Sequence, residues 1–101
     1  MAMLHTVNKS PFERNSFDTC LSHAKAGSSV LLFEDGIYAV LKGGTASGRI
    51  TGSNGISVYA LGPDLKARGI GEDQIIDGVT IVDYEGFVDL VTSHDNVQSW
   101  L

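Results

Sequence analysis

The run Val-Leu-Leu-Phe at residues 30–33 restricts the possible folds of this chain more than any other feature. It is an uninterrupted apolar stretch, with serines before it and Glu34, Asp35 and Gly36 after it. Short runs of this kind are typical of strands that are buried on both faces, as in parallel sheets. Further segments rich in β-branched or alternating residues complete a set of strands, which we predict at residues 3–7, 29–33, 56–60 and 79–83, with a short last strand in VQSWL.

Helical patterns separate these strands. The first helix begins at Ser10 or at a later asparagine or serine cap, and Gly27 suits the position after its end. Residues 62–69, GPDLKARG, have proline and aspartate early and basic residues late, which favours a short helix. Residues 85–94, EGFVDLVTSH, return to helical spacing, with one apolar stripe formed by Phe87, Leu90, Val91 and His94. The segment GIYAVLKGG predicts no more than a short helical turn.

The alternation of strands and helices predicts the architecture. Right-handed crossovers between parallel strands give a three-layer α/β/α sandwich with a mostly parallel sheet of about five strands. The length of 101 residues indicates one domain over residues 1–101. Functional sites in such sheets usually lie beyond the carboxyl ends of the strands.

Composition excludes several classes of protein. Hydrophobic residues make up 43% of the chain and charged residues 19%, against roughly 25% charged residues in a typical soluble domain. Chance and coverage of the surface by a partner chain are both open explanations. The net charge of −5 disfavours direct binding to nucleic acid. One cysteine cannot form an internal disulfide, which fits a cytoplasmic location, and neither a signal peptide nor a membrane-spanning run is expected.

Nucleotide and metal sites have weak support. Gly43 and Gly48 have the spacing of a P-loop, but Arg49 and Ile50 stand where lysine and serine or threonine are needed. We therefore predict that residues 43–55 form a surface loop, with a frayed helix across its middle as the alternative. The histidines lie far apart without ligand spacing, so no metal and no cofactor are expected. His94 lies on the apolar stripe of residues 85–94, and we interpret it as a histidine with satisfied hydrogen bonds or one at an interface.

Two candidate chemical groups remain. Glu34 and Asp35 follow a buried strand, the usual place for a site, although acidic residues before a glycine turn are also common in loops. Cys20 shares a helical face with apolar neighbours, but it lies at the edge of that stripe, with His23 on the polar side. Spacing favours a structural thiol over a reactive one and leaves both open. We expect Cys20 to be at least partly reachable from solvent or from a subunit interface.

Several stretches closely resemble the DsrH/TusB family: LHTVNKSPFERNSFDTCL, VLLFEDGIYA, VYALGPDLKARG and VDYEGFVDL. The resemblance covers Met3 to Leu101 and is poorest over residues 43–55. DsrH is the smallest subunit of the DsrEFH complex of sulfur-oxidising bacteria, and TusB is a component of the sulfur relay that makes 2-thiouridine in tRNA.

The resemblance implies a mostly parallel sheet between helical layers and a cytoplasmic heterohexamer. Its partners would be DsrE-like and DsrF-like subunits, two copies of each, with a DsrC/TusE-like protein as sulfur acceptor. It implies transfer of sulfane sulfur as cysteine persulfide, with the main carrier cysteine on the DsrE/TusD-like partner. Contact of this chain itself with nucleic acid or membrane is not expected.

Cys20 in SFDTCL resembles the sulfur-oxidation branch, because TusB-type members can lack a cysteine at this position. We therefore expect a subunit of a DsrEFH-type sulfurtransferase complex in dissimilatory sulfur oxidation. Cys20 is then the candidate persulfide carrier, and His23 is a candidate helper whose positive charge favours the anionic persulfide. The alternative is a TusB-like structural subunit of the tRNA 2-thiouridine relay that carries no sulfur.

Overall fold

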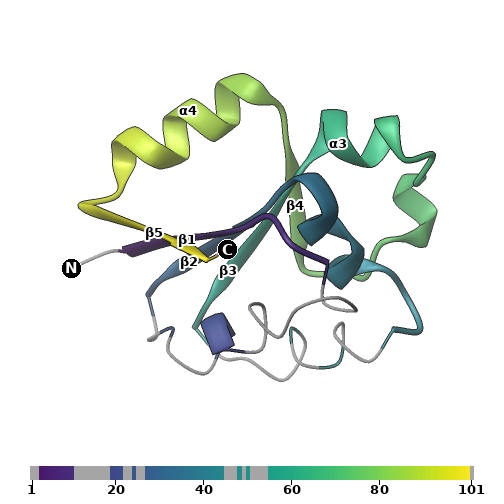
Figure 1. Ribbon diagram of the computed structural model, residues 1–101, viewed down its shortest axis with the longest axis horizontal. Coiled ribbons are helices and arrows are strands. Elements are labelled where there is room, and N and C mark those ends of the chain that lie inside the picture. Colours follow the sequence, from purple (N-terminus) through teal and green to yellow (C-terminus); the bar gives the residue numbers. More distant parts are fainter. Residues whose placement is uncertain are drawn as a thin grey trace.

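The computed structural model contains a five-stranded sheet (Figure 1). Every pair of neighbouring strands is parallel, in the order β4-β3-β2-β1-β5. The strands are β1 (Met3–Val7), β2 (Ser29–Leu32), β3 (Ser57–Leu61), β4 (Val79–Val82) and β5 (Asn96–Trp100). The predicted fold class is confirmed, and each predicted strand overlaps an observed one. The structure describes residues 3–10, 19–21, 24, 27–44, 48, 50 and 55–100.

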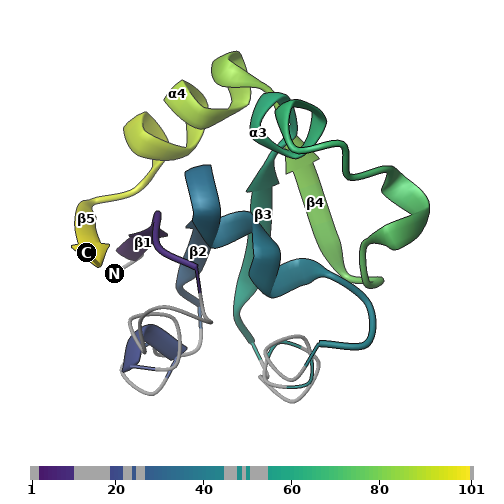
Figure 2. The ribbon, with the colours of Figure 1, turned by 45° about the vertical axis from the view of Figure 1, so that its right-hand side comes forward.

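The strand order explains which face each connection covers. From β1 to β4 the chain moves across the sheet in one direction, and it then returns to place β5 beside β1. Because crossovers are right-handed, the reversal puts the last connection on the opposite face of the sheet. That connection is α4 (Tyr84–Ser93), which runs from the end of β4 towards β5 (Figure 2).

A separate core cluster lies on each face of the sheet. Under α4, the side chains of Leu4, Leu31 and Leu90 are buried together. On the other face, the cluster contains Val7, Val30 and Leu32 from the strands and also Cys20 and Leu21. All four residues of β2 are buried, as the apolar run predicts for a strand covered on both faces.

Short helices follow the strands at their carboxyl ends. The 3-10 helix η1 (Glu34–Val40) follows β2 directly, so the weak helical turn predicted there is a real element of seven residues. α3 (Gly62–Ala67) follows β3, and a second 3-10 helix, η2 (Glu72–Gln74), precedes β4. Gly27 and Gly69 have φ angles of 90° and 71°, which confirms the left-handed positions after the two predicted helices.

The predicted apolar stripe of α4 is correct in part. Leu90 is buried and Phe87 and His94 are half-buried, but Val91 is exposed. The expected stripe was too wide because a single helix on an open sheet face buries a narrow set of positions. Asp83 caps this helix by accepting a hydrogen bond of 2.8 Å from the Gly86 backbone.

The glycine-rich segment is described in part. Residues 45–47, 49 and 51–54 lie outside the described residues. Gly48 and Ile50 are helical and Ile50 is buried, so the helical alternative fits the described part better than a surface loop. Within the described ranges, no helix is long and apolar enough to cross a membrane.

Candidate functional site

Cys20 lies in the core on the face of the sheet opposite α4. Residues 19–21 are helical, and the Cys20 carbonyl accepts a hydrogen bond of 2.9 Å from the Ala24 N–H. The Cys20 side chain has 0% exposed surface and is a free thiol. The expected access from solvent is therefore absent in this chain, and the expected access from a subunit interface stays a prediction. Cys20 and its neighbour Leu21 are buried together in the cluster on this face of the sheet.

Burial also suppresses the chemistry of this thiol. Desolvation raises the pKa of Cys20 from 9.0 to about 12, because the charged thiolate loses its water. At pH 7 that shift lowers the thiolate fraction roughly a thousandfold. The thiolate is the nucleophile in sulfur transfer, so burial and the raised pKa both oppose sulfur transfer at Cys20 in this conformation. His23, the predicted helper, lies outside the described residues, and its role stays a prediction.

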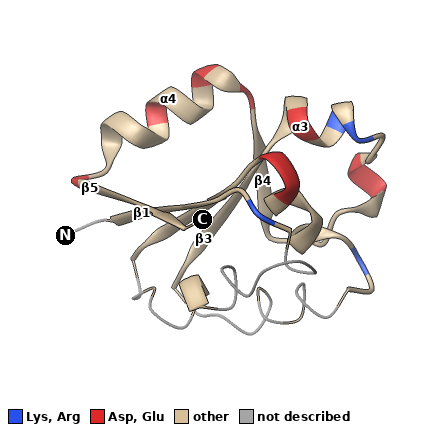
Figure 3. Ribbon diagram, in the orientation of Figure 1, with Lys and Arg blue, Asp and Glu red and all other residues tan. Residues whose placement is uncertain are grey.

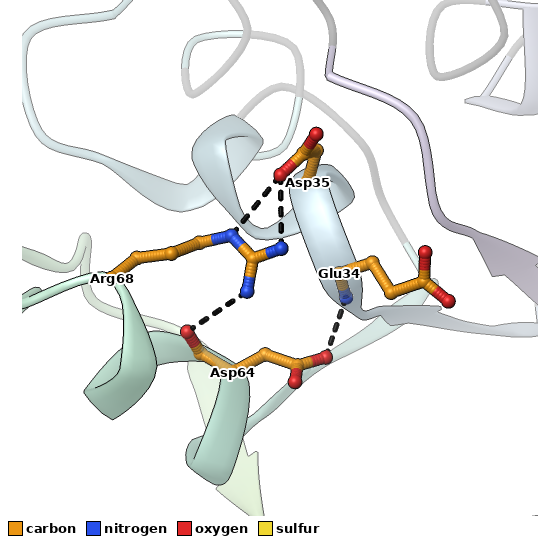
Figure 4. Close-up of polar contacts among 4 residues, drawn as sticks. All are labelled: Glu34, Asp35, Asp64 and Arg68. Atoms are coloured by element: carbon orange, nitrogen blue, oxygen red, sulfur yellow. Dashed lines mark hydrogen bonds and ion pairs between the residues drawn. The ribbon is translucent and has the colours of Figure 1, made fainter.

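A polar cluster joins the carboxyl ends of β2 and β3 (Figure 4). Asp35 accepts hydrogen bonds from Arg68 Nε at 3.1 Å and Nη2 at 2.9 Å, both at its Oδ1 atom. Arg68 Nη1 also donates to the backbone carbonyl of Asp64 at 3.4 Å. The Asp64 carboxylate accepts a hydrogen bond from the Glu34 backbone N–H. These contacts tie the start of η1 to α3 and the residue after it, between positions 30 and 33 residues apart in the sequence.

The cluster orders the backbone and supplies no evident acid–base pair. The Arg68 and Asp35 side chains are 26% and 50% exposed, and such solvent-screened pairs contribute about 0–1 kcal/mol to stability. The hydrogen bonds to Asp35 raise the pKa of Arg68 above its usual value. Glu34 and Asp35 thus lie where the sequence placed a candidate site, but Asp35 is engaged by Arg68. The sequence analysis did not predict this pairing. Arg68, the late arginine in GPDLKARG, was the residue that could have indicated a partner for the acidic residues after β2.

The turn after β2 is tightly constrained. Glu34 has a φ angle of 49°, a left-handed conformation that is costly for a residue with a side chain. Two residues later, a Cβ added to Gly36 would lie 2.2 Å from the Val7 backbone oxygen. Glycine is therefore required here so that η1 can pass close to the end of β1.

The two described histidines are structural. His94 donates from Nδ1 to the Leu90 carbonyl at 2.7 Å, and its Nε2 lies 2.9 Å from Ser29 Oγ. This confirms the interpretation of His94 as a histidine with satisfied hydrogen bonds. His5 accepts a hydrogen bond of 3.1 Å from Trp100 Nε1, which links β1 to β5. Among the residues that the structure describes, no three potential metal-ligating side chains gather into a site.

Comparison with known proteins gives matches over nearly the whole chain. A family model described as "DsrH like protein" matches residues 9–97. The protein named TusB from Pectobacterium parmentieri is 38% identical over 98 residues, which cover 97% of this chain and 100% of that protein. The TusB of Escherichia coli K12 is 35% identical over 98 residues, with the same coverage.

Solved structures support the fold. The crystal structure of the ychN protein from E. coli matches with a TM-score of 0.81 at 20% identity, covering 99% of both chains. A protein of unknown function from Methanobacterium thermoautotrophicum matches with a TM-score of 0.73 at 16% identity, over 96% of this chain and 97% of that one. At these identities the likeness concerns the fold alone.

Proposed function

The chain belongs to the DsrH/TusB family, and we propose that it is a structural subunit of a sulfur-relay complex and carries no sulfur itself. The observation that carries this proposal is the complete burial of Cys20, the single cysteine of the chain. A persulfide carrier must offer a thiolate to an incoming persulfide. Cys20 is fully buried, and desolvation raises its pKa, which favours the neutral thiol.

The chemistry of the relay defines what the partners must supply. A carrier thiolate attacks the outer sulfur of a donor persulfide, the S–S bond breaks, and the donor thiolate leaves. In this proposal the carrier cysteine belongs to a DsrE/TusD-like subunit, and a DsrC/TusE-like protein accepts the sulfur. The present chain, in the cytoplasm, holds DsrE-like and DsrF-like subunits in a heterohexamer with two copies of each subunit. The names of the 35–38% identical relatives favour the tRNA 2-thiouridine relay as the setting.

A second candidate function retains Cys20 as a persulfide carrier in a DsrEFH-type complex of dissimilatory sulfur oxidation. One observation favours it: the chain has a thiol in the stretch SFDTCL, which resembles the DsrH branch. This function requires the helical segment around Cys20 to open in the complex, so that the thiol reaches solvent and its pKa falls.

Sulfur transfer through the reconstituted complex tests the proposal. We expect Cys20→Ala to transfer sulfur from a persulfide donor to the acceptor at the wild-type rate, because the thiol takes no part. Replacement of the carrier cysteine on the DsrE/TusD-like subunit is the matched control, and it should abolish transfer. A loss of more than tenfold in a correctly assembled Cys20→Ala complex would favour the second candidate.

A further inference from the structure

The outer surface of α4 carries large apolar side chains that this chain leaves uncovered. Tyr84 is 63% exposed, Val88 is 58% exposed and Val91 is 38% exposed. At about 100° per residue these three positions lie within about 60° of one another on the helix. They form one stripe, which borders the half-buried Phe87. A stripe of this kind on a helix is typical of an interaction surface.

The stripe runs into a groove at the carboxyl ends of β2 and β3. The groove has a volume of about 310 Å³, and Tyr84 and Val88 form part of its lining. Phe33, Leu61 and Phe87 supply its other apolar side chains. Phe33 and Phe87 meet edge to face, with ring centroids 5.9 Å apart, which is a favourable aromatic contact in this part of the groove. The groove can accept one large apolar side chain from outside.

The charged residues in the groove lining and on α4 are acidic (Figure 3). Glu34 and Asp64 line the groove. Figure 3 shows acidic residues on α4 and no basic ones. The whole segment 69–101 lacks lysine and arginine and contains seven acidic residues: Glu72, Asp73, Asp77, Asp83, Glu85, Asp89 and Asp95. The cation of the neighbouring cluster, Arg68, is paired with Asp35.

We propose that the groove and the stripe of α4 dock a segment of another protein in which a large apolar side chain is flanked by lysine or arginine. The apolar side chain would fill the groove, while the basic residues would face Glu34 and Asp64. Charge complementarity of this kind selects partners and speeds their association. The same charge repels nucleic acid and anionic membranes. A two-fold contact with a second copy would bring two acidic faces together. The proposal does not depend on the sulfur chemistry proposed above.

Peptide titration of the isotope-labelled full-length chain, followed by NMR, tests the proposal. The probe is a pentapeptide that alternates lysine with leucine and phenylalanine. It is used up to about 5 mM, because a few contacts give a Kd near 1 mM. We expect saturable shifts at the amides of Phe33, Tyr84 and Val88. Two comparison peptides, one with glutamate for lysine and one with serine for the apolar residues, should bind at least about fivefold more weakly.

Matched variants separate the groove from general charge and hydrophobicity. Glu34→Lys should weaken the lysine peptide about threefold to tenfold, whereas Glu72→Lys, with the same change in net charge, should leave its affinity unchanged. Val88→Asn should weaken binding, whereas Val97→Asn, at an apolar position 46% exposed on β5, should not. Unfolding midpoints confirm that each variant is folded.

Three results would overturn the proposal. The first is the absence of shifts at the groove up to the highest peptide concentration. The second is equal binding of the lysine and glutamate peptides, or equal effects of Glu34→Lys and Glu72→Lys. The third is the appearance of the same shifts when the chain is concentrated without peptide, which would identify a second copy as the occupant.

Discussion

Replacing Cys20 by serine tests whether the thiol is part of the core. The side chain is fully buried, in one cluster with Val7, Val30 and Leu32. A hydroxyl placed there without a hydrogen-bond partner costs about 1–3 kcal/mol. At about 4–8 °C per kcal/mol for a domain of this size, Cys20→Ser should lower Tm by roughly 4–24 °C.

Cys20→Ala is the matched control for this experiment. Alanine loses the apolar burial of the sulfur and leaves a small cavity, at a cost of about 1 kcal/mol. Serine fills more of the volume than alanine but adds a hydroxyl that must lose its water. We therefore expect serine to be the less stable variant in urea unfolding followed by circular dichroism. If Cys20→Ser proves as stable as Cys20→Ala, the site is hydrated and the account of Cys20 as a core thiol is refuted.

Three further predictions concern pH, a glycine and the polar cluster. Burial raises the pKa of Cys20 from 9.0 to about 12, so the stability that depends on the neutral thiol is complete below pH 9 and is lost as the pH rises towards 12. Over that range the free energy of unfolding of the wild type should fall by up to about 1.4 kcal/mol per pH unit relative to Cys20→Ala, as measured by urea unfolding. Gly36→Ala should destabilise the fold by at least about 2 kcal/mol, because the added Cβ would lie 2.2 Å from the backbone oxygen of Val7 in β1. Gly44→Ala is the control and should change Tm little, because its added Cβ would lie 3.5 Å from the nearest atom. Arg68→Ala should cost less than about 1 kcal/mol, and high salt should reduce that cost; a larger, salt-independent loss would show that the cluster does more than order a turn.

The strands were predictable because their signals are local. The run at residues 30–33 is apolar at every position because β2 is buried on both faces. Gly27 and Gly69 marked helix ends because glycine adopts left-handed angles without a steric penalty. The return of the chain that places β5 beside β1 follows from no local pattern, since strand order depends on contacts between distant residues.

The candidate site was less predictable than the fold. Spacing placed Cys20 at the edge of an apolar stripe, but whether an edge position is buried depends on tertiary packing, and Cys20 is completely buried. The pairing of Asp35 with Arg68 joins residues 33 positions apart, and no periodicity reports such a contact. Val91 satisfied the helical spacing and is nonetheless exposed, because among the described helices only α4 packs against the cluster of Leu4 and Leu31.

The mass of this subunit after sulfur loading tests the central claim most directly. The assembled complex is treated with a persulfide donor, and native mass spectrometry then reports the mass of each subunit. If Cys20 is a core thiol, the DsrE/TusD-like subunit should gain a sulfur atom and this chain should keep its unmodified mass. The result should be the same for the wild type and for Cys20→Ala. A gain of one sulfur atom on the wild-type chain, absent from the assembled Cys20→Ala complex, would contradict the claim and make Cys20 a carrier.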